Sequence, residues 1–491
     1  MQGLAGTYGA SDKPLVARML AKLQHRGLDL QDIFSADSCT LGARMQARRP
    51  SERASAIAEE GSIAVASDSY IFNKEFLRHT IVPSLDRNVS DAQLMLKMYK
   101  SIGTGFFRYI DGAYAVVIVD NGKTIIARDS YGLKPLYLSG DSKEGAYSSE
   151  IKSQQETGME FVPFPPGRMM SSGEGFRRIT PVNLPWASRP GLKNPPEHVR
   201  ELLIQSVMNC SDDSGDLNVL LSGGIDSSVV AAAAAEIPSR IQSVCVGTED
   251  SEDIKMARLV ANHLSTSHRE RIYDLEDMLE ILDDAIYYGE TFDYPLVRSC
   301  IPNYMATHMF SNRHSVTLCG EGGDEIFAGY DFLLGVKKDK QLRDERIALL
   351  KEGHATGFQR VDRMTASASL DGRMPIMSRP IVDYGLQLDR KSLVGSNVEK
   401  SKLVLRKAFS DSLPRQVVWR RKQRFSDGAG SINMLVKHAE RSISDKEFEK
   451  ERKSVPGGRI RTKEELMYYR IFRRHFHSRS ALAAVGFTPR P

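Results

Sequence analysis

The sequence predicts an α/β protein made of two unlike halves, and three observations lead to this prediction. In the first half, short β-type runs alternate with helical runs and with hairpin signals such as Asp120-Asn121-Gly122. From Glu197 onward, apolar strands alternate with helices, which is typical of a parallel sheet with helices on both faces. A proline-rich, weakly patterned segment separates the two halves, so we expect a linker there.

The expected elements follow the apolar runs in chain order. In the first half we expect helices at 15–23 and 91–101 and strands at 62–66, 113–119 and 123–127. In the second half we expect strands at 217–221, 241–247 and 315–319 and helices at 228–236 and 253–264, followed by a charged, helical stretch from about residue 333. The predicted domains are residues 1–182 and 197–485, joined by a linker at 183–196.

Composition limits the class of protein. The 491 residues are 41% hydrophobic, which is enough for more than one core. Lys and Arg number 67 against 62 Asp and Glu, and this weak, mixed excess does not indicate a nucleic-acid partner. The five cysteines are scattered without a CxxC pair, so we expect neither disulfides nor a zinc site, and a reducing compartment. Without a signal segment or a long apolar run, we expect a cytoplasmic protein with no membrane span.

The most informative segment is VLLSGGIDSSVVAAAAAE, residues 219–236, because it joins an apolar strand, a Ser/Gly turn and an Ala-rich helix. Gly223 and Gly224 let the backbone approach an anion, which would face the positive end of the following helix. The hydroxyl groups of Ser222, Ser227 and Ser228 add donors. Asp226 adds a carboxylate, which makes electrostatic sense beside phosphates only with a cation such as Mg²⁺ between them. The segment predicts a phosphate-binding turn that lacks the lysine of the Walker pattern.

Two further motifs carry charged groups. The segment CGEGGDEIFAGY, residues 319–330, crowds Glu321, Asp324 and Glu325 into a glycine-rich turn after another apolar strand. Because close carboxylates repel one another unless a cation neutralises them, we expect Mg²⁺ shared between Asp226 and Asp324. The segment RRKQRFSDGAG, residues 420–430, places Lys422 where an ammonium could stabilise charge that develops on pyrophosphate or on a tetrahedral intermediate.

These motifs, together with CVGTEDSEDIKMARLVANHL between them, resemble the synthetase domain of the asparagine synthetase family. The turn itself is similar to the SGGxDS loop of enzymes that split ATP into AMP and pyrophosphate. In the first half, HRG at 25–27, Ser90-Asp91, IDGAYAVVIVD at 110–120 and ARDSYGLKPLY at 127–137 resemble the family's glutaminase domain. The resemblance implies an Ntn-hydrolase-like α-β-β-α sandwich followed by a parallel-sheet ATP-pyrophosphatase (PP-loop) domain.

The resemblance also implies roles for individual residues, with ATP and Mg²⁺ as cofactors. Glu321 would orient or deprotonate a nitrogen nucleophile, and Lys422 would stabilise charge in both half-reactions. Arg298 and Asp324 would contact the substrate, and Asp226 and Asp324 would hold the metal. ATP and pyrophosphate would be held by Leu220, Ser222, Gly223, Gly224, Asp226, Ser227, Ser228, Val246 and Gly320.

The first half departs from the family at its nucleophile. Class II glutaminases use a cysteine exposed as the N-terminal residue after removal of Met, but this position is Gln2, whose carboxamide is not a nucleophile. The family's NGE turn is replaced by Asp68-Ser69-Tyr70. Arg44 and Asp91 align with residues that hold the carboxylate and amine of glutamine, so part of the pocket is expected to persist. We expect no glutamine hydrolysis.

The second half departs from the family at the substrate. Paired threonines before an arginine, which help to hold aspartate in the family, appear here as Pro295-Leu296 before Arg298, and 371–375 reads DGRMP in place of a Glu-Ala-Arg-Val-Pro run. Because a polar substrate loses matched donors there, the carboxylate is not expected to be aspartate.

The predicted function is an AMP-forming amide-bond synthetase, a carbon–nitrogen ligase that adenylates a carboxylate and lets ammonia or a substrate amine attack, as in relatives similar to β-lactam synthetase. Asparagine synthesis from aspartate and ammonia is the first alternative. A tRNA-modifying adenylating enzyme is the second, although no nucleic-acid-binding region is visible. A catalytically silent scaffold is disfavoured because Asp226, Glu321, Asp324 and Lys422 are all present. The expected partners are a small-molecule or peptide carboxylate and an amine or ammonia, with no nucleic acid and no membrane, and a homodimer stays open.

Overall fold

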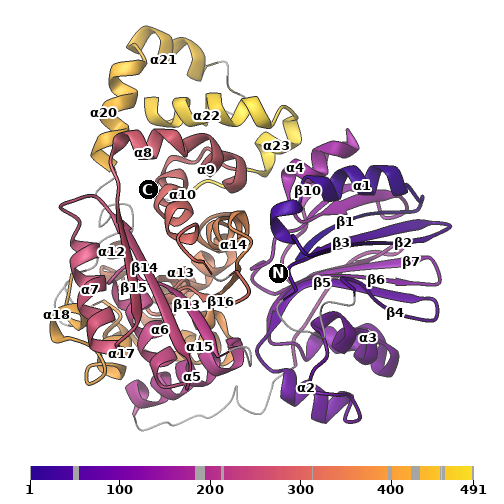
Figure 1. Ribbon diagram of the computed structural model, residues 1–491, viewed down its shortest axis with the longest axis horizontal. Helices are drawn as coiled ribbons and strands as arrows, with labels where there is room; N and C mark the ends of the chain where they lie inside the picture. The colour runs from indigo at the N-terminus through magenta and orange to yellow at the C-terminus, as the bar shows by residue number, and fades with distance from the viewer. Residues whose placement is uncertain are drawn as a thin grey trace.

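The computed structural model describes residues 2–47, 55–182, 194–211, 215–311, 313–395, 401–421, 432–453, 455 and 459–488. These residues form two six-stranded sheets and one five-stranded sheet. In Figure 1 the first two sheets lie together on one side of the molecule, and the third sheet lies on the other side among the helices of the second half.

The first half is an α-β-β-α sandwich of antiparallel sheets. One sheet has the order β10-β8-β9-β1-β3-β2 and the other β12-β11-β7-β6-β5-β4. Helices α1 and α4 lie outside the first sheet, and α2 and α3 lie outside the second (Figure 1). The strands are β1 (Gln2–Tyr8), β2 (Leu30–Ala36), β3 (Cys39–Met45), β4 (Ala58–Glu60), β5 (Ile63–Ile71), β6 (Gly112–Asp120), β7 (Lys123–Arg128), β8 (Tyr137–Gly140), β9 (Gly145–Ser148), β10 (Phe161–Pro163), β11 (Arg168–Ser171) and β12 (Gly175–Arg178), and the helices are α1 (Lys13–Ala21), α2 (Lys74–Ile81), α3 (Asp91–Ile102) and α4 (Ile151–Gln154).

Strand β6 shows how the sequence produces this sandwich. Its residues alternate between two apolar clusters: Val117 packs in the core between the sheets, and its neighbour Val116 packs under α3. The strand ends at a two-residue turn in which Asn121 and Gly122 have φ angles of 47° and 80°. Both angles are positive, as the tight hairpin turn between β6 and β7 requires, so the predicted hairpin is confirmed.

The second half is built on a parallel sheet of order β15-β14-β13-β16-β17. Its strands are β13 (Asp216–Leu220), β14 (Arg240–Gly247), β15 (Ser267–Ile272), β16 (Val316–Leu318) and β17 (Asp371–Arg373). The chain leaves β13 toward β14 on one side, and β16 joins β13 on the other side. The strand order therefore reverses between β13 and β16, which is where open parallel sheets bind ligands.

Two large apolar cores cover the two faces of this sheet. Cys245 faces a core shared with α5, α6 and α7, and its neighbours Val244 and Val246 face a core shared with α9, α10 and α22. The helices of this half are α5 (Pro195–Cys210), α6 (Ile225–Ala235), α7 (Glu252–Leu264), α8 (Leu275–Glu280), α9 (Leu282–Gly289), α10 (Tyr294–Thr307), α11 (Gly323–Ile326), α12 (Asp331–Leu334), α13 (Asp339–Glu352), α14 (Gly357–Ser367), α15 (Arg379–Gln387), α16 (Arg390–Leu393), α17 (Leu403–Ala408), α18 (Arg415–Val418), α20 (Ile432–Ser442), α21 (Asp445–Arg452), α22 (Lys463–His475) and α23 (Arg479–Ala484).

Three details differ from the sequence prediction. Helix α6 begins at Ile225, three residues before the predicted start, so Asp226 lies in the first helical turn and not in the loop. Strands β15 and β17 were not predicted, because their sequences SHRERI and DGR are polar edge strands without an apolar run. Helix α5 begins at Pro195, where proline suits a first helical turn, and most of the expected linker lies outside the described residues.

Candidate active site

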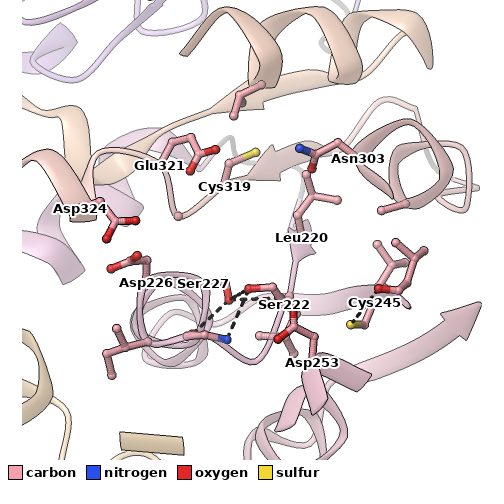
Figure 2. Close-up of a pocket in the computed structure, with 18 of the residues that line it drawn as sticks. Leu220, Ser222, Asp226, Ser227, Cys245, Asp253, Asn303, Cys319, Glu321 and Asp324 are labelled. Atoms are coloured by element: carbon pink, nitrogen blue, oxygen red, sulfur yellow. Dashed lines mark hydrogen bonds between the residues drawn. The ribbon is translucent and has the colours of Figure 1, made fainter. Parts of the chain in front are cut away.

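A cavity of about 160 Å³ opens at the carboxyl ends of β13, β14 and β16. The loop between β13 and α6 forms its floor, and the loop after β16 faces it across the cavity (Figure 2). Nine of the predicted site residues line it: Leu220, Ser222, Gly224, Asp226, Ser227, Val246, Gly320, Glu321 and Asp324. Residues from distant parts of the chain also line it, including Asn303, Arg360, Lys402 and Arg420.

The Ser/Gly turn is held by hydroxyl groups of its own residues. Ser227 Oγ accepts a hydrogen bond from Ser222 N at 3.1 Å and lies 3.0 Å from Ser222 Oγ. Gly224 N donates to Ser222 Oγ at 3.3 Å. Gly224 is the N-cap of α6, so the first amide groups of a largely buried helix face the cavity. Amide groups at such a helix start favour an anion, and the arrangement suits a phosphate chain.

Glycine is required at two points of this site. Gly223 has a φ of +67°, and a Cβ there would lie 2.5 Å from Ala257 N of α7. A Cβ on Gly320 would lie 2.7 Å from Ser227 N, so the loop after β16 packs directly on the first turn of α6. These close contacts bring the two predicted motifs together at the carboxyl ends of β13 and β16.

The carboxylates of Asp226 and Asp324 point toward each other (Figure 2). Lys402 Nζ forms an ion pair with Asp226 Oδ2 and another with Asp324 Oδ1, the latter at 2.7 Å. Burial alone would lower the pKa of Lys402, but the two carboxylates outweigh burial and raise this pKa. The ammonium group therefore occupies the position between the two predicted metal ligands, and one buried cation serves both carboxylates.

Sequence reasoning missed Lys402. It precedes α17 in the left-handed conformation, with a φ of 57°, and no glycine-rich or charged motif marks it in the sequence. Its place follows from the packing of α17, which contacts α5 and α6. Gly329, at the end of the second motif, lies against it, since a Cβ there would clash with both Lys402 Cε and Asp324 Oδ1.

Further charged pairs surround the cavity. Glu321, the predicted general base, forms an ion pair with Arg360 of α14. Arg420 Nη2 lies 2.8 Å from Asp253 Oδ1, and Arg420 Nη1 donates to Gly223 O at 3.5 Å. Burial lowers the pKa of Arg360, which nevertheless stays above any physiological pH because guanidinium groups do not deprotonate in proteins. The cavity thus offers cations on several sides of the phosphate-type turn.

Three predicted site residues of the described ranges do not line the cavity, and a fourth, Lys422, lies outside those ranges. Ser228 is fully buried in α6, and Gly223 shapes the turn without lining the cavity. Arg298 is not among the lining residues; its Nε and Nη2 donate to the Glu464 carboxylate at 2.5–3.1 Å, and Glu464 is nearly inaccessible to solvent. Lys422 and the FSDGAG segment lie outside the described residues.

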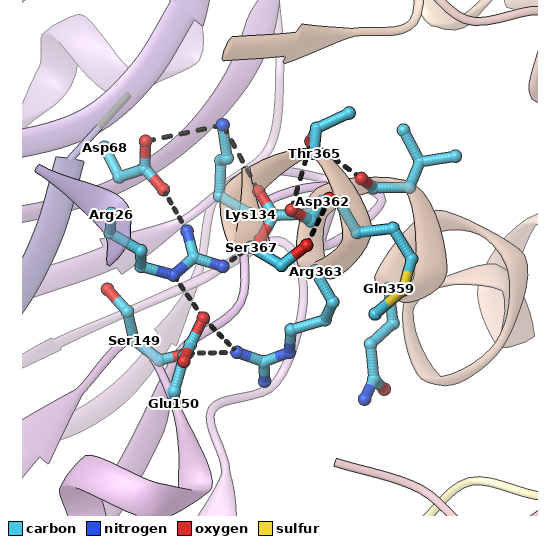
Figure 3. Close-up of polar contacts among 12 residues, drawn as sticks. Arg26, Asp68, Lys134, Ser149, Glu150, Gln359, Asp362, Arg363, Thr365 and Ser367 are labelled. Carbon is cyan, nitrogen blue, oxygen red and sulfur yellow. Dashed lines mark hydrogen bonds and ion pairs between the residues drawn. The ribbon is translucent and has the colours of Figure 1, made fainter. Parts of the chain in front are cut away.

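The N-terminal pocket is occupied by charged groups. Gln2 N donates to Asp68 Oδ1 at 3.0 Å, and Gln2 Nε2 donates to Met45 Sδ at 3.0 Å. Asp68 also pairs with Arg26 at 3.1 Å and with Lys134 at 3.4 Å (Figure 3). All four of these polar residues are buried. Where the family places an asparagine, this chain therefore carries a buried carboxylate next to the backbone nitrogen of residue 2.

The other expected pocket residues are also engaged. Asp91 accepts a hydrogen bond from Ser69 Oγ at 3.0 Å and pairs with Lys74 at 2.7 Å. Arg44 donates to two backbone carbonyls, of Leu20 and Gly27. All five cysteines are buried and lie outside disulfides, and burial raises the pKa of the Cys39 thiol.

A buried ionic cluster joins this pocket to the second half (Figure 3). Arg26 forms ion pairs with Asp362 of α14 and, at 2.5 Å, with Glu150. Arg363 of α14 bridges Glu150 at 2.9 Å and Glu290 at 2.7 Å. The cluster pairs four cations with four carboxylates: Arg26, Lys134, Lys152 and Arg363 with Asp68, Glu150, Glu290 and Asp362. Charge is therefore balanced at the contact between the two halves.

The described ranges contain neither a cluster of metal-ligating side chains nor a membrane-spanning helix. No three His, Cys, Asp or Glu side chains gather there in a way that could hold a metal ion by themselves. No described helix is long and apolar enough to cross a membrane.

Comparisons with known proteins agree with this geometry. Residues 198–356 and 335–487 match the family described as asparagine synthase, and residues 1–161 match the glutamine amidotransferase domain. A protein of Triphysaria versicolor named asparagine synthetase [glutamine-hydrolyzing] is 31% identical over 100% of this chain and 89% of its own, and a Lotus japonicus protein of that name is 30% identical over 99% and 88%. Among solved structures, a glutamine PRPP amidotransferase from B. subtilis covers 55% of this chain and 81% of its own at 16% identity and a TM-score of 0.31. The chain therefore belongs to the asparagine synthase family, a family of ATP-dependent carbon–nitrogen ligases.

Proposed function

We propose that this protein is an AMP-forming amide-bond synthetase whose nitrogen does not come from glutamine. A substrate carboxylate oxygen attacks the α-phosphorus of ATP, and pyrophosphate leaves to give an acyl-adenylate. Ammonia or an amine of the substrate then attacks the acyl carbon, and AMP leaves. The observation that carries the proposal is the Ser/Gly turn at the N-terminus of α6, which faces Glu321 and Asp324 across one cavity.

The predicted site residues have the following roles in this scheme. Ser222, Gly223, Gly224 and Ser227 hold the pyrophosphate end of ATP, with Ser228 supporting the helix turn from inside. Leu220, Val246 and Gly320 border the adenine and ribose. Glu321 positions the nitrogen nucleophile and accepts its proton, and Lys422 stabilises charge on the leaving pyrophosphate.

Two carboxylates fit a Mg²⁺ site, because Mg²⁺ usually takes one or two carboxylates and completes its shell with phosphate oxygens and water. Asp226 and Asp324 would hold the ion, which would neutralise the phosphate charge. With Mg²⁺ bound, the Lys402 ammonium group would either remain beside these carboxylates or turn toward the phosphates. It would lie near negative charge in both positions.

Residues in the first half of the chain argue against glutamine as the nitrogen source. Residue 2 is a glutamine, Cys39 is buried in β3, and Asp68 places a negative charge 3.0 Å from the backbone nitrogen of residue 2. A neighbouring carboxylate disfavours both a thiolate and an oxyanion. The proposal is that residues 1–182 are a glutaminase-like domain without glutaminase activity, joined by the 183–196 linker to a synthetase domain at 197–485.

The carboxylate is proposed not to be aspartate. Pro295 and Leu296 offer no hydroxyl donors, and Leu296 is buried in the core. The Arg298 guanidinium, which would otherwise receive a substrate carboxylate, is paired with Glu464. Asparagine synthesis from ammonia stays as the second candidate, because the Triphysaria and Lotus relatives carry that enzyme's name over nearly the whole chain.

The test is a product analysis of the full-length protein with MgATP and a panel of carboxylic acids. Hydroxylamine serves as the nucleophile, since it converts any acyl-adenylate into a hydroxamate. We expect AMP, pyrophosphate and hydroxamate to form together with at least one acid, and labelled pyrophosphate to exchange into ATP. Asp324→Asn should abolish exchange, while the control Asp331→Asn, on α12 and outside the cavity lining, should not. ADP and phosphate as the main products would contradict adenylation.

A further inference from the structure

A second cavity, of about 580 Å³, lies between the two halves of the molecule. One wall is formed by the beginning of β6, the turn after β7 and strands β11 and β12. The opposite wall is formed by the end of α13, the short helix η6 (Pro375–Met377) and the start of α15. Among the described residues it has no lining residue in common with the ATP cavity. Its volume falls in the range of small-molecule sites.

The lining of this cavity carries an excess of positive charge. Four cationic side chains, Arg168, Arg178, Lys351 and Arg379, face two carboxylates, Asp111 and Asp383, which gives a formal excess of two. Of the four cations, only Arg379 has a carboxylate of the described residues within ion-pair distance. Both halves contribute cations, so the charge belongs to the interface and not to one surface helix. An unpaired excess of this kind favours an anionic ligand.

Arg379 supplies a more specific observation. Its Nε lies 3.3 Å from Asp383 Oδ2, and its backbone N donates to Asp111 Oδ1 at 2.9 Å. Its side chain is 16% exposed and lines the cavity, so an anion in the cavity can contact the guanidinium group.

Asp111 and His354 of the lining offer little opposition to an anion. Burial raises the pKa of Asp111 to about 7, so this carboxyl group carries only part of a negative charge at neutral pH. Burial, with a smaller contribution from Arg128, lowers the pKa of His354 to about 4, so its ring is neutral. His354 Nδ1 donates to Lys351 O at 2.7 Å, which fixes the tautomer that leaves Nε2 as an acceptor.

We propose that this cavity binds a small organic polyanion, a molecule with at least two carboxylate or phosphate groups, held by cations from both halves, Arg379 among them. This site is separate from the proposed catalytic function and needs none of its steps. Because the ligand would contact both halves, its binding would favour their docked arrangement and stabilise the folded protein.

The experiment is calorimetric titration of the full-length protein with three probes: citrate for carboxylates, fructose 1,6-bisphosphate for phosphates, and 3-phosphoglycerate for the mixed case. Titrations are run at constant ionic strength in KCl, with glycerol as the uncharged control, and are repeated in saturating MgATP. We expect at least one probe to bind at a single saturable site with unchanged affinity in MgATP. The probe that binds best identifies the acidic group.

Variants locate the binding site. Arg379→Gln should weaken binding by about tenfold or more, the usual effect of losing a charged hydrogen bond. Lys351→Gln, at the exposed end of α13, should weaken it less and provides a second test if Arg379→Gln does not fold. Arg441→Gln, an exposed position of α20 outside both cavities, is the matched control. The proposal is overturned if no probe binds beyond the KCl effect, if MgATP displaces the probe, or if Lys351→Gln and Arg379→Gln both bind as the control does.

Discussion

Replacing Asp362 by asparagine should be strongly destabilising, because Asp362 lies in the buried ionic cluster between the halves. Its side chain is 4% exposed, one carboxylate oxygen pairs with Arg26, and the other lies 3.3 Å from Lys134 Nζ. Asparagine keeps the shape and removes the charge, so four buried cations would face three carboxylates. Breaking a buried ion pair by removing one partner costs roughly 3–5 kcal/mol.

The assay is thermal and urea unfolding, followed by circular dichroism at one scan rate. For a domain of this size, about 3–5 kcal/mol corresponds to a fall in melting temperature of roughly 6–20 °C. The control is Asp344→Asn on the exposed side of α13, which should stay within about 0.5 kcal/mol of the parent. The double variant Asp362→Asn with Lys134→Gln restores the charge balance and should lose less than the sum of the single variants. A single variant as stable as the control, or a strictly additive double variant, would refute the reasoning.

Acid unfolding gives a second readout of the same cluster. Burial alone would raise the pKa of Asp362, but Arg26 and Lys134 outweigh it and lower this pKa; His25 and Lys152, followed by two arginines, do the same for Glu150. A carboxylate with a depressed folded-state pKa stabilises the protein above its unfolded-state pKa, near 4, and loses this contribution as the pH falls through the folded value. The parent should therefore lose this stability only below about pH 4, and Asp362→Asn should show a shallower loss there.

Three further predictions concern the N-terminal pocket around Gln2 and the ATP and substrate site. The single variant Gln2→Cys should release no glutamate from glutamine above a blank, because the Asp68 carboxylate disfavours the thiolate. Glutamate release by this variant, without Asp68→Asn added, would contradict the proposed effect of Asp68 on the thiolate. Lys402→Met should tighten Mn²⁺ binding to the nucleotide-free protein, read by electron paramagnetic resonance, since the ammonium no longer competes; unchanged or weaker binding would speak against two shared carboxylates. Aspartate with ammonium should form asparagine at least about tenfold more slowly than the best acid forms its hydroxamate. The reasons are that each lost hydrogen-bond donor costs roughly 1–3 kcal/mol and that Arg298 is paired with Glu464. Rapid asparagine formation would instead identify the protein as an asparagine-forming enzyme.

The parts of the fold that sequence predicted are those with a strong local signal. The apolar runs of β13, β14 and β16 and the Ala-rich α6 were predicted within a few residues, because buried parallel strands are mostly apolar. Edge strands β15 and β17 carry no such signal, since half or more of their residues are polar and their pairing comes from β14 and β16.

The site residues that sequence predicted are likewise those with a strong local signal. The Ser/Gly turn and the acidic turn were found because each follows an apolar strand and carries its chemistry within a few residues. Lys402, Arg360 and Asn303 arrive from helices packed around the sheet, and only the tertiary fold brings them to the cavity. The pairing of Arg298 with Glu464 is equally non-local, because 166 residues separate the two side chains. No sequence pattern of either residue alone indicates that this guanidinium is occupied.

The Asp68-Ser69-Tyr70 segment, expected to replace a turn, lies within strand β5, and its substitution has a structural consequence as well as a chemical one. A neutral side chain at position 68 would leave Arg26, Lys134, Lys152 and Arg363 with three carboxylates in a region closed to water. The Asp68 carboxylate supplies the fourth negative charge, so the group that we propose disfavours glutamine hydrolysis also balances the contact with α14. Asp68→Asn should weaken the contact between the two halves, because an unpaired buried charge is costly. The same substitution would make the pocket around residue 2 more favourable for a thiolate. Packing then explains why the first half is retained without a cysteine at position 2. Its Arg26, Lys134 and Glu150 form ion pairs with Asp362 and Arg363 of α14, the helix that also lines the ATP cavity.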